Sequence, residues 1–444
     1  MPERTNFSRR GLLKGAAAAI AAPYIVPASA LGKGVWKAPS ERITLGSIGV
    51  GNMGSGHFWN YLNQGHLRDR VQIVAVCDVD KTKREKYRKM AEDKYADRKG
   101  TASYKGVDVY NEYEKLLERP DIDAVVIAVP DHWHATIAIA AARAGKDIYC
   151  EKPMTLTIGD AQALVKAIRR YGRVFQTGSQ QRSDGNFRLA CELVRSGRIG
   201  KLKKVTVGIG GPSQERYLPE EPIPEGFDWE RWLGPAPSQP YNSTRCSGDY
   251  GGGWRHIRDY SGGMMTDWGA HHFDIAQWGL GMDGAGKGPD EIIFHGHVPS
   301  IGETPEEGKG IEFRYKNTQW GEVPMFHGQA RGILFTGADG TIEVNRGYLA
   351  SNPGDILLEP LGANDVHLYE SPGHETDWLN CIRSRQRPIC DVEIGASTVI
   401  TCHLGNMAYW LGRSLKWDPI KGEIIGDEEA KRWQDRPKRG TWRM

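Results

Sequence analysis

The sequence has few cysteines, almost no excess of charge and no long apolar run. Its 444 residues include only 7 cysteines, which are scattered and form no Cys-x-x-Cys pair, so a disulfide-stapled scaffold is excluded. Lysine and arginine number 58 against 55 aspartate and glutamate, which leaves no basic surface for nucleic acid or an anionic membrane as a partner. With 39% hydrophobic residues, the composition is that of a soluble globular protein of two or three domains.

The first thirty residues have the pattern of an export signal. Residues 8–14 read SRRGLLK, a mildly apolar run follows over 15–26, and residues 28–30 (ASA) form a small-x-small cleavage site. This pattern resembles a twin-arginine signal and predicts a periplasmic or otherwise exported protein that is cleaved near Ala30. The alternative is an N-terminal membrane helix, but a bilayer takes ~20 apolar residues and this run is shorter and broken by proline. We therefore expect no stable membrane insertion after cleavage.

Apolar, β-branched runs alternate with helical stretches from residue 41 onwards. These runs lie at 43–48, 71–77, 124–129, 147–150 and 174–177. Near-continuous apolar strands are what a parallel sheet covered on both faces requires. Residues 41–180 are therefore predicted to form a doubly wound α/β domain of the Rossmann type.

The strand pattern changes in the second half of the chain. Strand-like stretches lie at 203–209, 291–298, 310–315, 322–326, 332–335, 341–344 and 355–359. Gly, Asn and Pro turns divide them, together with one strong helix near 263–279, which predicts for residues 181–444 an α+β domain with an open, mainly antiparallel sheet. Helices expected near 375–384 and 394–413 are predicted to pack back on the first domain. The aromatic span 211–253, rich in Pro and Gly, is predicted to cover a site rather than to link domains.

The first predicted strand runs into a glycine-rich turn, where a helical segment begins. The turn reads Gly49-Val50-Gly51-Asn52-Met53-Gly54. A lone Gly-x-Gly-x-x-Gly is a weak signal, but between a strand and a helix the three glycines serve the tight turn, the close approach of a pyrophosphate, and the packing of helix on strand. The helix N-terminus then offers free N–H groups to the phosphates. The turn, with Asn52 and Met53 in it, is predicted to bind a dinucleotide.

Asp78 stands at the end of the second predicted strand. A carboxylate in this position accepts hydrogen bonds from the adenosine ribose hydroxyls, and it repels a 2′-phosphate, which favours NAD as the cofactor. Lys81, Lys83 and Arg84 follow closely and are able to accept that phosphate. NADP therefore stays open as the alternative.

Chemistry is expected where the fifth predicted strand ends in Glu151-Lys152-Pro153, because ligands of an open α/β sheet gather beyond the carboxyl ends of its strands. Asp267 and His271 head the helix predicted near 263–279, and their i, i+4 spacing places them on one helix face. The three residue types suit alcohol oxidation: a histidine takes the hydroxyl proton, an ammonium stabilises the alkoxide, and a carboxylate orients them. Lys152, Asp267 and His271 are therefore the predicted catalytic residues.

These motifs, in this order, resemble the Gfo/Idh/MocA (glucose-fructose oxidoreductase / inositol dehydrogenase / rhizopine catabolism) family. The resemblance covers residues 41–444 and rests on the glycine turn, on Glu151-Lys152-Pro153 and on Asp267-x-Gly269-x-His271-x-x-Asp274; the C-terminal end resembles that of a bacterial subgroup. It implies a nicotinamide-dependent oxidoreductase acting on a sugar, glycoside or cyclitol hydroxyl, with Lys152 and His271 as the catalytic pair and Asp267 as their partner. It also implies a homodimer or homotetramer formed through the second sheet.

Further residues are predicted at the site from their position or type. Pro130 and His134 match the family's Pro-Asn-x-x-His, with Asp131 in place of Asn, and are expected near the cofactor together with Glu151; helix capping by Asp131 is the alternative. Substrate contacts are expected from Gln181, Arg182, Arg255, His256, Asp267, His271 and His272. The pairs His132-x-His134 and His271-His272 lack a third ligand nearby, so no metal site is predicted.

Export constrains the expected mechanism. The periplasm holds little free nicotinamide nucleotide, so an exported dehydrogenase works only if its cofactor stays bound and is recycled in place. The hydride then returns to a second sugar, or to an oxidised intermediate of the first, as in a redox-neutral glycosidase or lyase that oxidises, eliminates, hydrates and reduces again. Family relatives of that hydrolase kind depart from Glu-Lys-Pro, which is intact here, and this favours the oxidoreductase. A non-catalytic nicotinamide- or sugar-binding protein is the third alternative.

Overall fold

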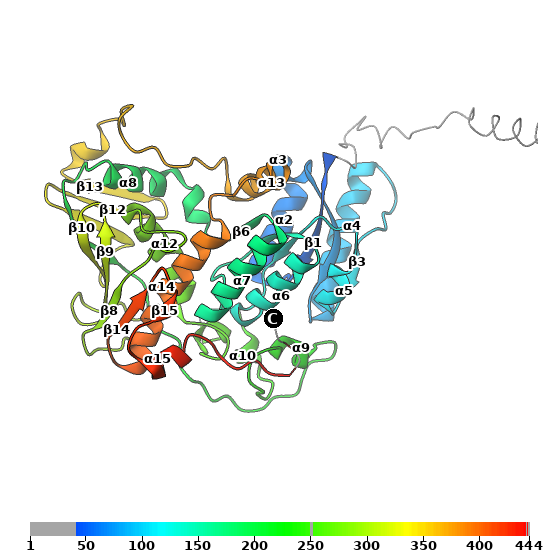
Figure 1. Ribbon diagram of the computed structural model, residues 1–444. Helices are drawn as coiled ribbons and strands as arrows, with labels where there is room; N and C mark the ends of the chain where they lie inside the picture. Colours follow the sequence, from blue (N-terminus) through cyan, green and yellow to red (C-terminus); the bar gives the residue numbers. More distant parts are fainter. Residues whose placement is uncertain (1–40, 249–251, 441, 443–444) are drawn as a thin grey trace, which may run out of the picture. The chain divides into compact units, whose positions relative to one another are not determined.

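The computed structural model describes residues 41–248, 252–440 and 442 (Figure 1). The chain divides into Met1–Arg42 and Ile43–Met444, and every labelled helix and strand belongs to the second unit. The export signal predicted for residues 1–30 lies outside the described residues. No helix in the described ranges is both long and apolar enough to cross a membrane.

The first sheet has six parallel strands in the order β3-β2-β1-β4-β5-β6. Its strands are β1 (Ile43–Ile48), β2 (Val71–Cys77), β3 (Asp108–Tyr110), β4 (Ala124–Ile127), β5 (Asp147–Cys150) and β6 (Phe175–Thr177). The accompanying helices are α2 (Asn52–Asn63), α3 (Gly65–Arg68), α4 (Lys81–Lys99), α5 (Tyr113–Leu117), α6 (Asp131–Arg143) and α7 (Ile158–Tyr171). The strand order reverses between β1 and β4, and in such a sheet the ligand crevice lies beyond the carboxyl ends of these strands. The predicted Rossmann fold is confirmed.

Local sequence explains where these helices begin and why the strands are apolar. The Asp80 carboxylate accepts hydrogen bonds from the backbone N–H groups of Thr82 and Lys83 at the start of α4. The Thr157 hydroxyl does the same for Asp160 at the start of α7, and both are favoured capping residues. Strands β1, β2, β4 and β5 are buried along nearly their whole length, as helices on both faces require.

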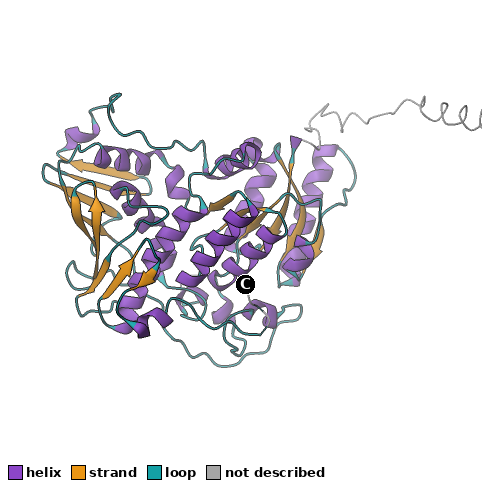
Figure 2. Cartoon of the chain, viewed as in Figure 1, coloured by secondary structure: helices purple, strands orange, loops and turns teal. Residues whose placement is uncertain are grey.

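The second sheet, drawn as orange strands at the left of Figure 2, has nine strands in the order β13-β12-β11-β7-β10-β9-β8-β14-β15. Its strands are β7 (Leu202–Val207), β8 (Glu291–Phe294), β9 (Ile311–Thr318), β10 (Gly321–His327), β11 (Ile333–Gly337), β12 (Thr341–Asn345), β13 (Tyr348–Asn352), β14 (Leu415–Asp418) and β15 (Glu423–Ile424). Strands β7 and β10 run parallel, and the other described pairs of this sheet are antiparallel. Helices α8 (Gly185–Arg195) and α12 (Gly269–Leu280) pack against the sheet. The predicted open, mainly antiparallel sheet is confirmed.

Several predicted elements of the second half differ from the structure. The strand expected at 355–359 is a 3₁₀ helix, η4 (Gly354–Leu357): Ile356 and Leu357 both pack against the core while Leu358 is 82% exposed, which is not the alternation of a strand. The helix expected near 263–279 is two helices, α11 (Met264–Asp267) and α12, divided at Trp268. The strands β3, β13, β14 and β15 are not among the predictions, because such short strands carry no apolar run of their own.

One helix belongs to both hydrophobic cores. Helix α14 (Val392–Leu411) packs against α7 and against α12. Its N-terminal half gives Val392, Ala396 and Val399 to the core of the first domain, and its C-terminal half gives Cys402, Leu404 and Met407 to that of the second. The remaining elements are η2 (Gln180–Ser183), α9 (Trp229–Leu233), α10 (Ser243–Cys246), η3 (Trp254–His256), α13 (His374–Ser384) and α15 (Glu428–Arg432).

Candidate active site

The glycine turn after β1 is shaped by close packing on two sides and is open on a third. Gly49 has a φ of +82°, and a Cβ there would lie 2.4 Å from the carbonyl oxygen of Ala128. A Cβ on Gly54 would lie 2.1 Å from the carbonyl oxygen of Gly49, so α2 approaches the turn more closely than a side chain allows. A Cβ on Gly51 would meet nothing within 4 Å. The turn thus combines the tight bend, the close helix packing and the open approach that a pyrophosphate needs.

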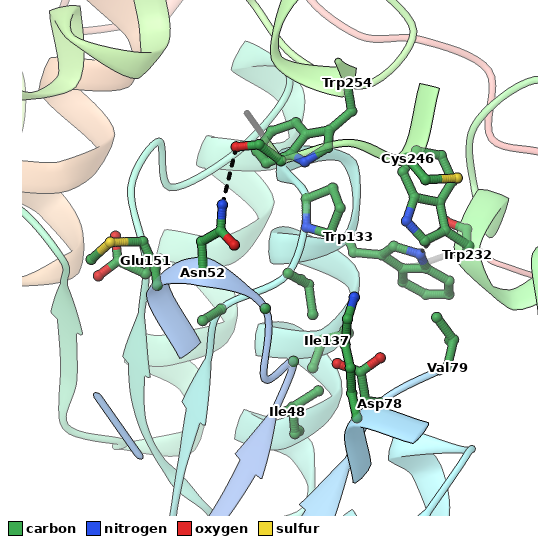
Figure 3. Close-up of a pocket in the computed structure, with 18 of the residues that line it drawn as sticks. Ile48, Asn52, Asp78, Val79, Trp133, Ile137, Glu151, Trp232, Cys246 and Trp254 are labelled. Atoms are coloured by element: carbon green, nitrogen blue, oxygen red, sulfur yellow. Dashed lines mark hydrogen bonds between the residues drawn. The ribbon is translucent and has the colours of Figure 1, made fainter. Parts of the chain in front are cut away.

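Helix α2 begins beside this open side without a capping side chain. Its N-cap residue is Gly51, which makes no side-chain hydrogen bond to the first helical N–H groups. These groups and the helix dipole are therefore available to an anion. The Asn52 Nδ2 donates to the carbonyl oxygen of Gly248 at 3.4 Å (Figure 3), and Met53 is 43% exposed. The phosphates of a dinucleotide fit this helix start.

Asp78 is held next to the turn by two backbone donors. Its Oδ2 accepts a hydrogen bond from the N–H of Val50 and its Oδ1 one from the N–H of Asp80, each at 2.9 Å. Burial raises the pKa of Asp78, and the two donors and the charge of Lys83 partly counter that rise. Asp78 and Lys83 line one cavity together with the glycine turn, whereas the guanidinium of Arg84 donates to the carbonyl oxygen of Asp78. The carboxylate is thereby fixed where the ribose of a dinucleotide lies in this fold.

A segment of the second domain covers the crevice. The N–H of Lys81 donates to the carbonyl oxygen of Gly226 at 2.9 Å, and the N–H of Asp228 donates to that of Val79 at 3.0 Å. Beyond these bonds the segment brings Trp232 and Cys246 into the cavity wall that faces Ile48 and Asp78, where Trp254 also lies (Figure 3). We call residues 226–248 the cover segment; part of the span predicted to cover a site does so.

The C-terminal residues hold the cover segment in place. The backbone N–H of Arg439 donates to the carbonyl oxygen of Pro235 at 3.0 Å, and its Nε donates to that of Ala236 at 3.1 Å. The ring of Trp442 packs edge-on against Trp133 of α6, with 5.0 Å between centroids. The guanidinium of Arg231 lies 5.4 Å from the Trp442 ring. The tail therefore joins the cover segment to the first domain.

Lys152 and Asp267 meet in the same cavity as the glycine turn. The cavity lined by Gly49, Gly51, Asp78, Lys152 and Asp267 is called the first cavity. The Lys152 Nζ lies 2.6 Å from the Asp267 Oδ1 and donates also to the Asp267 carbonyl oxygen at 3.2 Å. Arg255 adds a second cation, with its Nε 3.5 Å from the same Oδ1. Residues of the two domains thus form one buried charged cluster beyond the nucleotide-binding turn.

His271 lies close to this cluster as a neutral base. Its side chain is 4% exposed, and its Nδ1 has no hydrogen-bond partner among the described residues. Burial lowers the pKa of His271 well below its ordinary value, and the positive charges of Lys152 and Arg346 lower it further. The prediction of one continuous helix carrying Asp267 and His271 is wrong, because α11 ends at Asp267 and α12 begins at Gly269.

Glu151 has a partner that no motif of the sequence predicts. His57 of α2 lies between two carboxylates, with Nε2 2.8 Å from Glu151 Oε1 and Nδ1 3.3 Å from Glu375 Oε1. Burial alone would lower the pKa of His57, but these two carboxylates outweigh it and raise the pKa to about 9. The pKa of Glu375 falls to about 2, because His57 outweighs the effect of burial. An imidazolium therefore holds the Glu151 side chain beside Lys152.

Comparison with known families identifies this arrangement. Two family models match the chain. The model described as "Oxidoreductase family, NAD-binding Rossmann fold" (GFO_IDH_MocA) matches residues 43–179, and the model described as "Oxidoreductase family, C-terminal alpha/beta domain" matches residues 193–316 and 331–444. The chain belongs to the Gfo/Idh/MocA oxidoreductase family. The resemblance expected from the motifs is confirmed, and the enzyme is an NAD-binding oxidoreductase.

Individual relatives span different shares of the oxidoreductase. Myo-inositol 2-dehydrogenase of Thermotoga maritima is 25% identical over 84% of this chain and 95% of its own length. The 2,7-anhydro-N-acetylneuraminate hydratase of Mediterraneibacter gnavus is 26% identical over 54% of this chain and 55% of its own length. The solved aldose-aldose oxidoreductase of Caulobacter crescentus, complexed with glycerol, has a TM-score of 0.55 at 18% identity and covers 84% of this chain and 99% of its own. At that identity the likeness shows the fold.

Three predicted site residues are buried and have internal hydrogen-bond partners. Arg182, expected at the substrate, is 2% exposed, and its Nε and Nη2 donate to the two carboxylate oxygens of Asp274 at 2.7 and 2.9 Å. His134, expected near the cofactor, bonds through Nδ1 to the carbonyl oxygen of Pro153 at 2.7 Å, and burial lowers its pKa to about 4. His272 is 3% exposed and bonds through Nδ1 to the carbonyl oxygen of Gly208 at 3.3 Å. Buried polar groups form hydrogen bonds with internal partners, and the position of a residue along the chain does not reveal which partner that is.

The other predicted residues divide between two cavities. Pro130, Glu151 and Arg255 line the first cavity, whereas His256 lies beside Arg255 in η3 and is not among the residues that line it. Gln181 lines a second cavity, which is bordered by Met53, His57, Gln180, Gln181, Arg346 and Glu375. Met53 lines both, so the two cavities adjoin. In the described part of the chain no group of three or more His, Cys, Asp or Glu residues is placed to hold a metal ion.

Proposed function

We propose that this oxidoreductase oxidises a hydroxyl-bearing carbon of a sugar, glycoside or cyclitol, with Lys152, Asp267 and His271 as its catalytic residues. The observation that carries the proposal is the 2.6 Å ion pair of Lys152 and Asp267, which lies in the cavity that begins at the glycine turn. The Thermotoga maritima relative, named myo-inositol 2-dehydrogenase, supports a polyol substrate.

The three side chains have different roles at the substrate hydroxyl. When bound, NAD supplies the hydride acceptor. The neutral imidazole of His271 accepts the hydroxyl proton. The Lys152 ammonium stabilises the oxygen as negative charge develops on it, and the Asp267 carboxylate holds Lys152 in place. The test is oxidation of a panel of sugars and cyclitols by the wild type and by Lys152→Ala. If the variant keeps full activity, the assignment is wrong.

We infer that the nucleotide stays bound through the catalytic cycle. The cover segment lies over the crevice, and the tail around Arg439 and Trp442 holds that segment against the first domain. A ligand beneath such a cover leaves only after these contacts open. The decisive measurement is to denature the purified protein and to identify the released nucleotide and its redox state. Stoichiometric NAD supports retention, stoichiometric NADP corrects the cofactor preference, and an empty protein that reduces added NAD overturns retention.

A redox-neutral hydrolase or lyase is the second candidate. The relative named 2,7-anhydro-N-acetylneuraminate hydratase favours it, because hydration is one step of the oxidation, elimination, hydration and reduction sequence. The intact Glu151-Lys152-Pro153 motif favours net oxidation. The two differ in their products, since net oxidation yields a carbonyl compound and needs a second substrate. The redox-neutral reaction releases an aglycone from a glycoside with no acceptor added.

Export through the twin-arginine route is the proposed localisation. Residues 1–30, with Arg9 and Arg10 and a cleavage site near Ala30, support it. A protein exported after folding crosses with its cofactor loaded, which agrees with a covered crevice. The test is cell fractionation of the full chain and of an Arg9→Lys/Arg10→Lys variant. The wild type is expected in the periplasm and the variant in the cytoplasm.

A homodimer or homotetramer through the second sheet is the proposed assembly. Helices α8 and α12 pack on this sheet, and side chains such as Pro324 and Phe326, which alternate with the buried Val323 and Met325, stay half-exposed. A sheet with one such face has room for a second copy of the chain. Light scattering after size-exclusion chromatography distinguishes the expected oligomer from a monomer of 49.4 kDa.

A further inference from the structure

Arg346 is a cation of the second cavity that the catalytic assignment does not use. It follows β12 at the turn into β13, and its guanidinium lies over the Trp268 ring, 4.9 Å from the centroid. Its Nε donates to the side-chain oxygen of Gln181 at 3.1 Å, with that amide oriented to satisfy both of its neighbours. The stacking and the hydrogen bond together fix the plane of the guanidinium.

The same residues connect Arg346 to the reacting centre. The side-chain nitrogen of Gln181 donates to the carbonyl oxygen of His271 at 3.2 Å. Burial lowers the pKa of His271, and the charge of Arg346 is among the charges that lower it further. Met53 lines both cavities. A group bound at Arg346 therefore lies in a cavity that adjoins the one lined by Lys152 and Asp267.

The charges around the second cavity leave Arg346 without an acidic partner. The imidazolium of His57 is paired with Glu151 and Glu375. Asp184 is the N-cap of α8 and accepts a hydrogen bond from the N–H of Asn186 at 2.9 Å. Among the described residues, no carboxylate forms an ion pair with Arg346, whose contacts are the Trp268 ring and Gln181. The guanidinium of Arg346 is therefore not ion-paired with any described residue, although Asp184 and Glu375 border the same cavity.

We propose that the second cavity is a substrate subsite in which Arg346 binds an oxyanion, so that the substrate is an acidic sugar. The proposal rests on the oxidoreductase function proposed above. A planar guanidinium binds a carboxylate or a phosphate through paired N–H donors. One face of this guanidinium is already covered by Trp268 and one nitrogen is engaged by Gln181. The remaining donors serve the carboxylate of a uronic acid or the phosphate of a sugar phosphate, while the hydroxyl to be oxidised lies at Lys152 and His271.

Binding to the purified holoprotein tests this without turnover. D-glucuronate, D-glucose 6-phosphate and D-glucose are titrated by calorimetry into the wild type, Arg346→Gln and Arg346→Lys. At least one acidic sugar is expected to bind more tightly than glucose, and Arg346→Gln is expected to weaken that binding by about 10- to 100-fold. Arg346→Lys keeps the charge and should restore part of it. The matched control is Arg331→Gln, since Arg331 is also exposed and stacks over an aromatic ring, that of Tyr348 at 3.9 Å, but does not line the cavity.

The binding results distinguish a carboxylate subsite, a phosphate subsite and the absence of an acidic subsite. Preference for glucuronate identifies a carboxylate, and preference for glucose 6-phosphate identifies a phosphate. Equal binding of glucose and both acids, equal losses for all three in Arg346→Gln, or no binding of either acid overturns the subsite. Arg346-dependent binding of an acid by a protein that oxidises no sugar refutes the proposed oxidoreductase function and leaves the subsite in place. If the wild type and Arg346→Gln oxidise neutral sugars equally well, the oxidoreductase function stands and the acidic-sugar subsite is refuted.

Discussion

Lys152 of the first domain and Asp267 of the second are joined by an ion pair of 2.6 Å in which both side chains are almost completely buried. Such a pair is costly to desolvate, and the removal of one partner destabilises the protein. Its position at the end of β5, beyond the glycine turn, is the reason for the catalytic role proposed above. On that proposal the ammonium lies where negative charge develops on the substrate oxygen, and the carboxylate holds it there.

Removal of either charge should abolish oxidation while the nucleotide stays bound. Lys152→Ala and Asp267→Asn are expected to lower kcat by at least about 100-fold, the usual range for a lost acid–base or electrostatic group. Nucleotide content after purification should match that of the wild type, because the glycine turn and the cover segment are untouched. A variant that retains more than a tenth of the activity would contradict the role of that residue.

Stability should fall in alkali because of His57. Its pKa in the folded protein is about 9, above the ordinary 6.5, so its contribution to stability is complete below pH 6.5 and is lost as the pH rises through 9. The groups facing it are Glu151, Glu375 and the ring of Tyr149. Glu375 acts in the opposite sense: its pKa is lowered to about 2, so its contribution is present above pH 4.5 and is lost as the pH falls toward 2.

Thermal melting from pH 6 to 10 measures this effect. The decline of Tm between pH 6.5 and 9.5 should be smaller in His57→Gln than in the wild type. His297→Gln is the control, because it removes a histidine that is paired with Glu303 but is 43% exposed, and it should leave the profile unchanged. Parallel profiles for the wild type and His57→Gln would show that the imidazolium does not contribute.

The C-terminal tail should control release of the nucleotide. The variant Arg439→Ala/Trp442→Ala loses the contacts of the Arg439 guanidinium with Ala236 and of the Trp442 ring with Trp133, and keeps the backbone bond to Pro235. The loss of contacts of this kind changes an equilibrium constant by about tenfold. Dialysis should therefore remove the nucleotide about tenfold faster. Kinetics of sugar oxidation in the presence of excess NAD should stay near those of the wild type. Unchanged release would mean that the cover segment is held without the tail.

Arg182 should prove important for stability. It is 2% exposed, and its guanidinium is paired with Asp274 and, at 3.0 Å, with Asp283. Arg182→Met leaves the buried Asp274 and the partly exposed Asp283 without their cation and should cost about 3–5 kcal/mol of the free energy of unfolding. Arg413→Ala, which removes an exposed pair with Asp427, should change Tm little. A stable Arg182→Met protein with a raised KM would instead restore the substrate role predicted from the sequence.

The features that the sequence predicts well are those encoded by neighbouring residues. The glycine turn and Glu151-Lys152-Pro153 each depend on a strand that ends and a turn that follows, and strand order places both at one edge of the sheet. The sequence does not reveal which residues distant along the chain become partners. Glu151 is 94 residues from His57 and Arg182 is 92 residues from Asp274. Arg346 has no motif at all, because an arginine at a hairpin turn is ordinary until the fold brings Trp268 and Gln181 beside it.

Helix α14 determines how this enzyme can move. One half of α14 is packed in the core of the first domain and the other half in that of the second. A rigid-body opening of the two domains would therefore disrupt one core or the other. The chain should therefore melt in a single transition, and neither domain is expected to survive when produced alone. Access to the active site must then depend on small local rearrangements around Met53 and the cover segment.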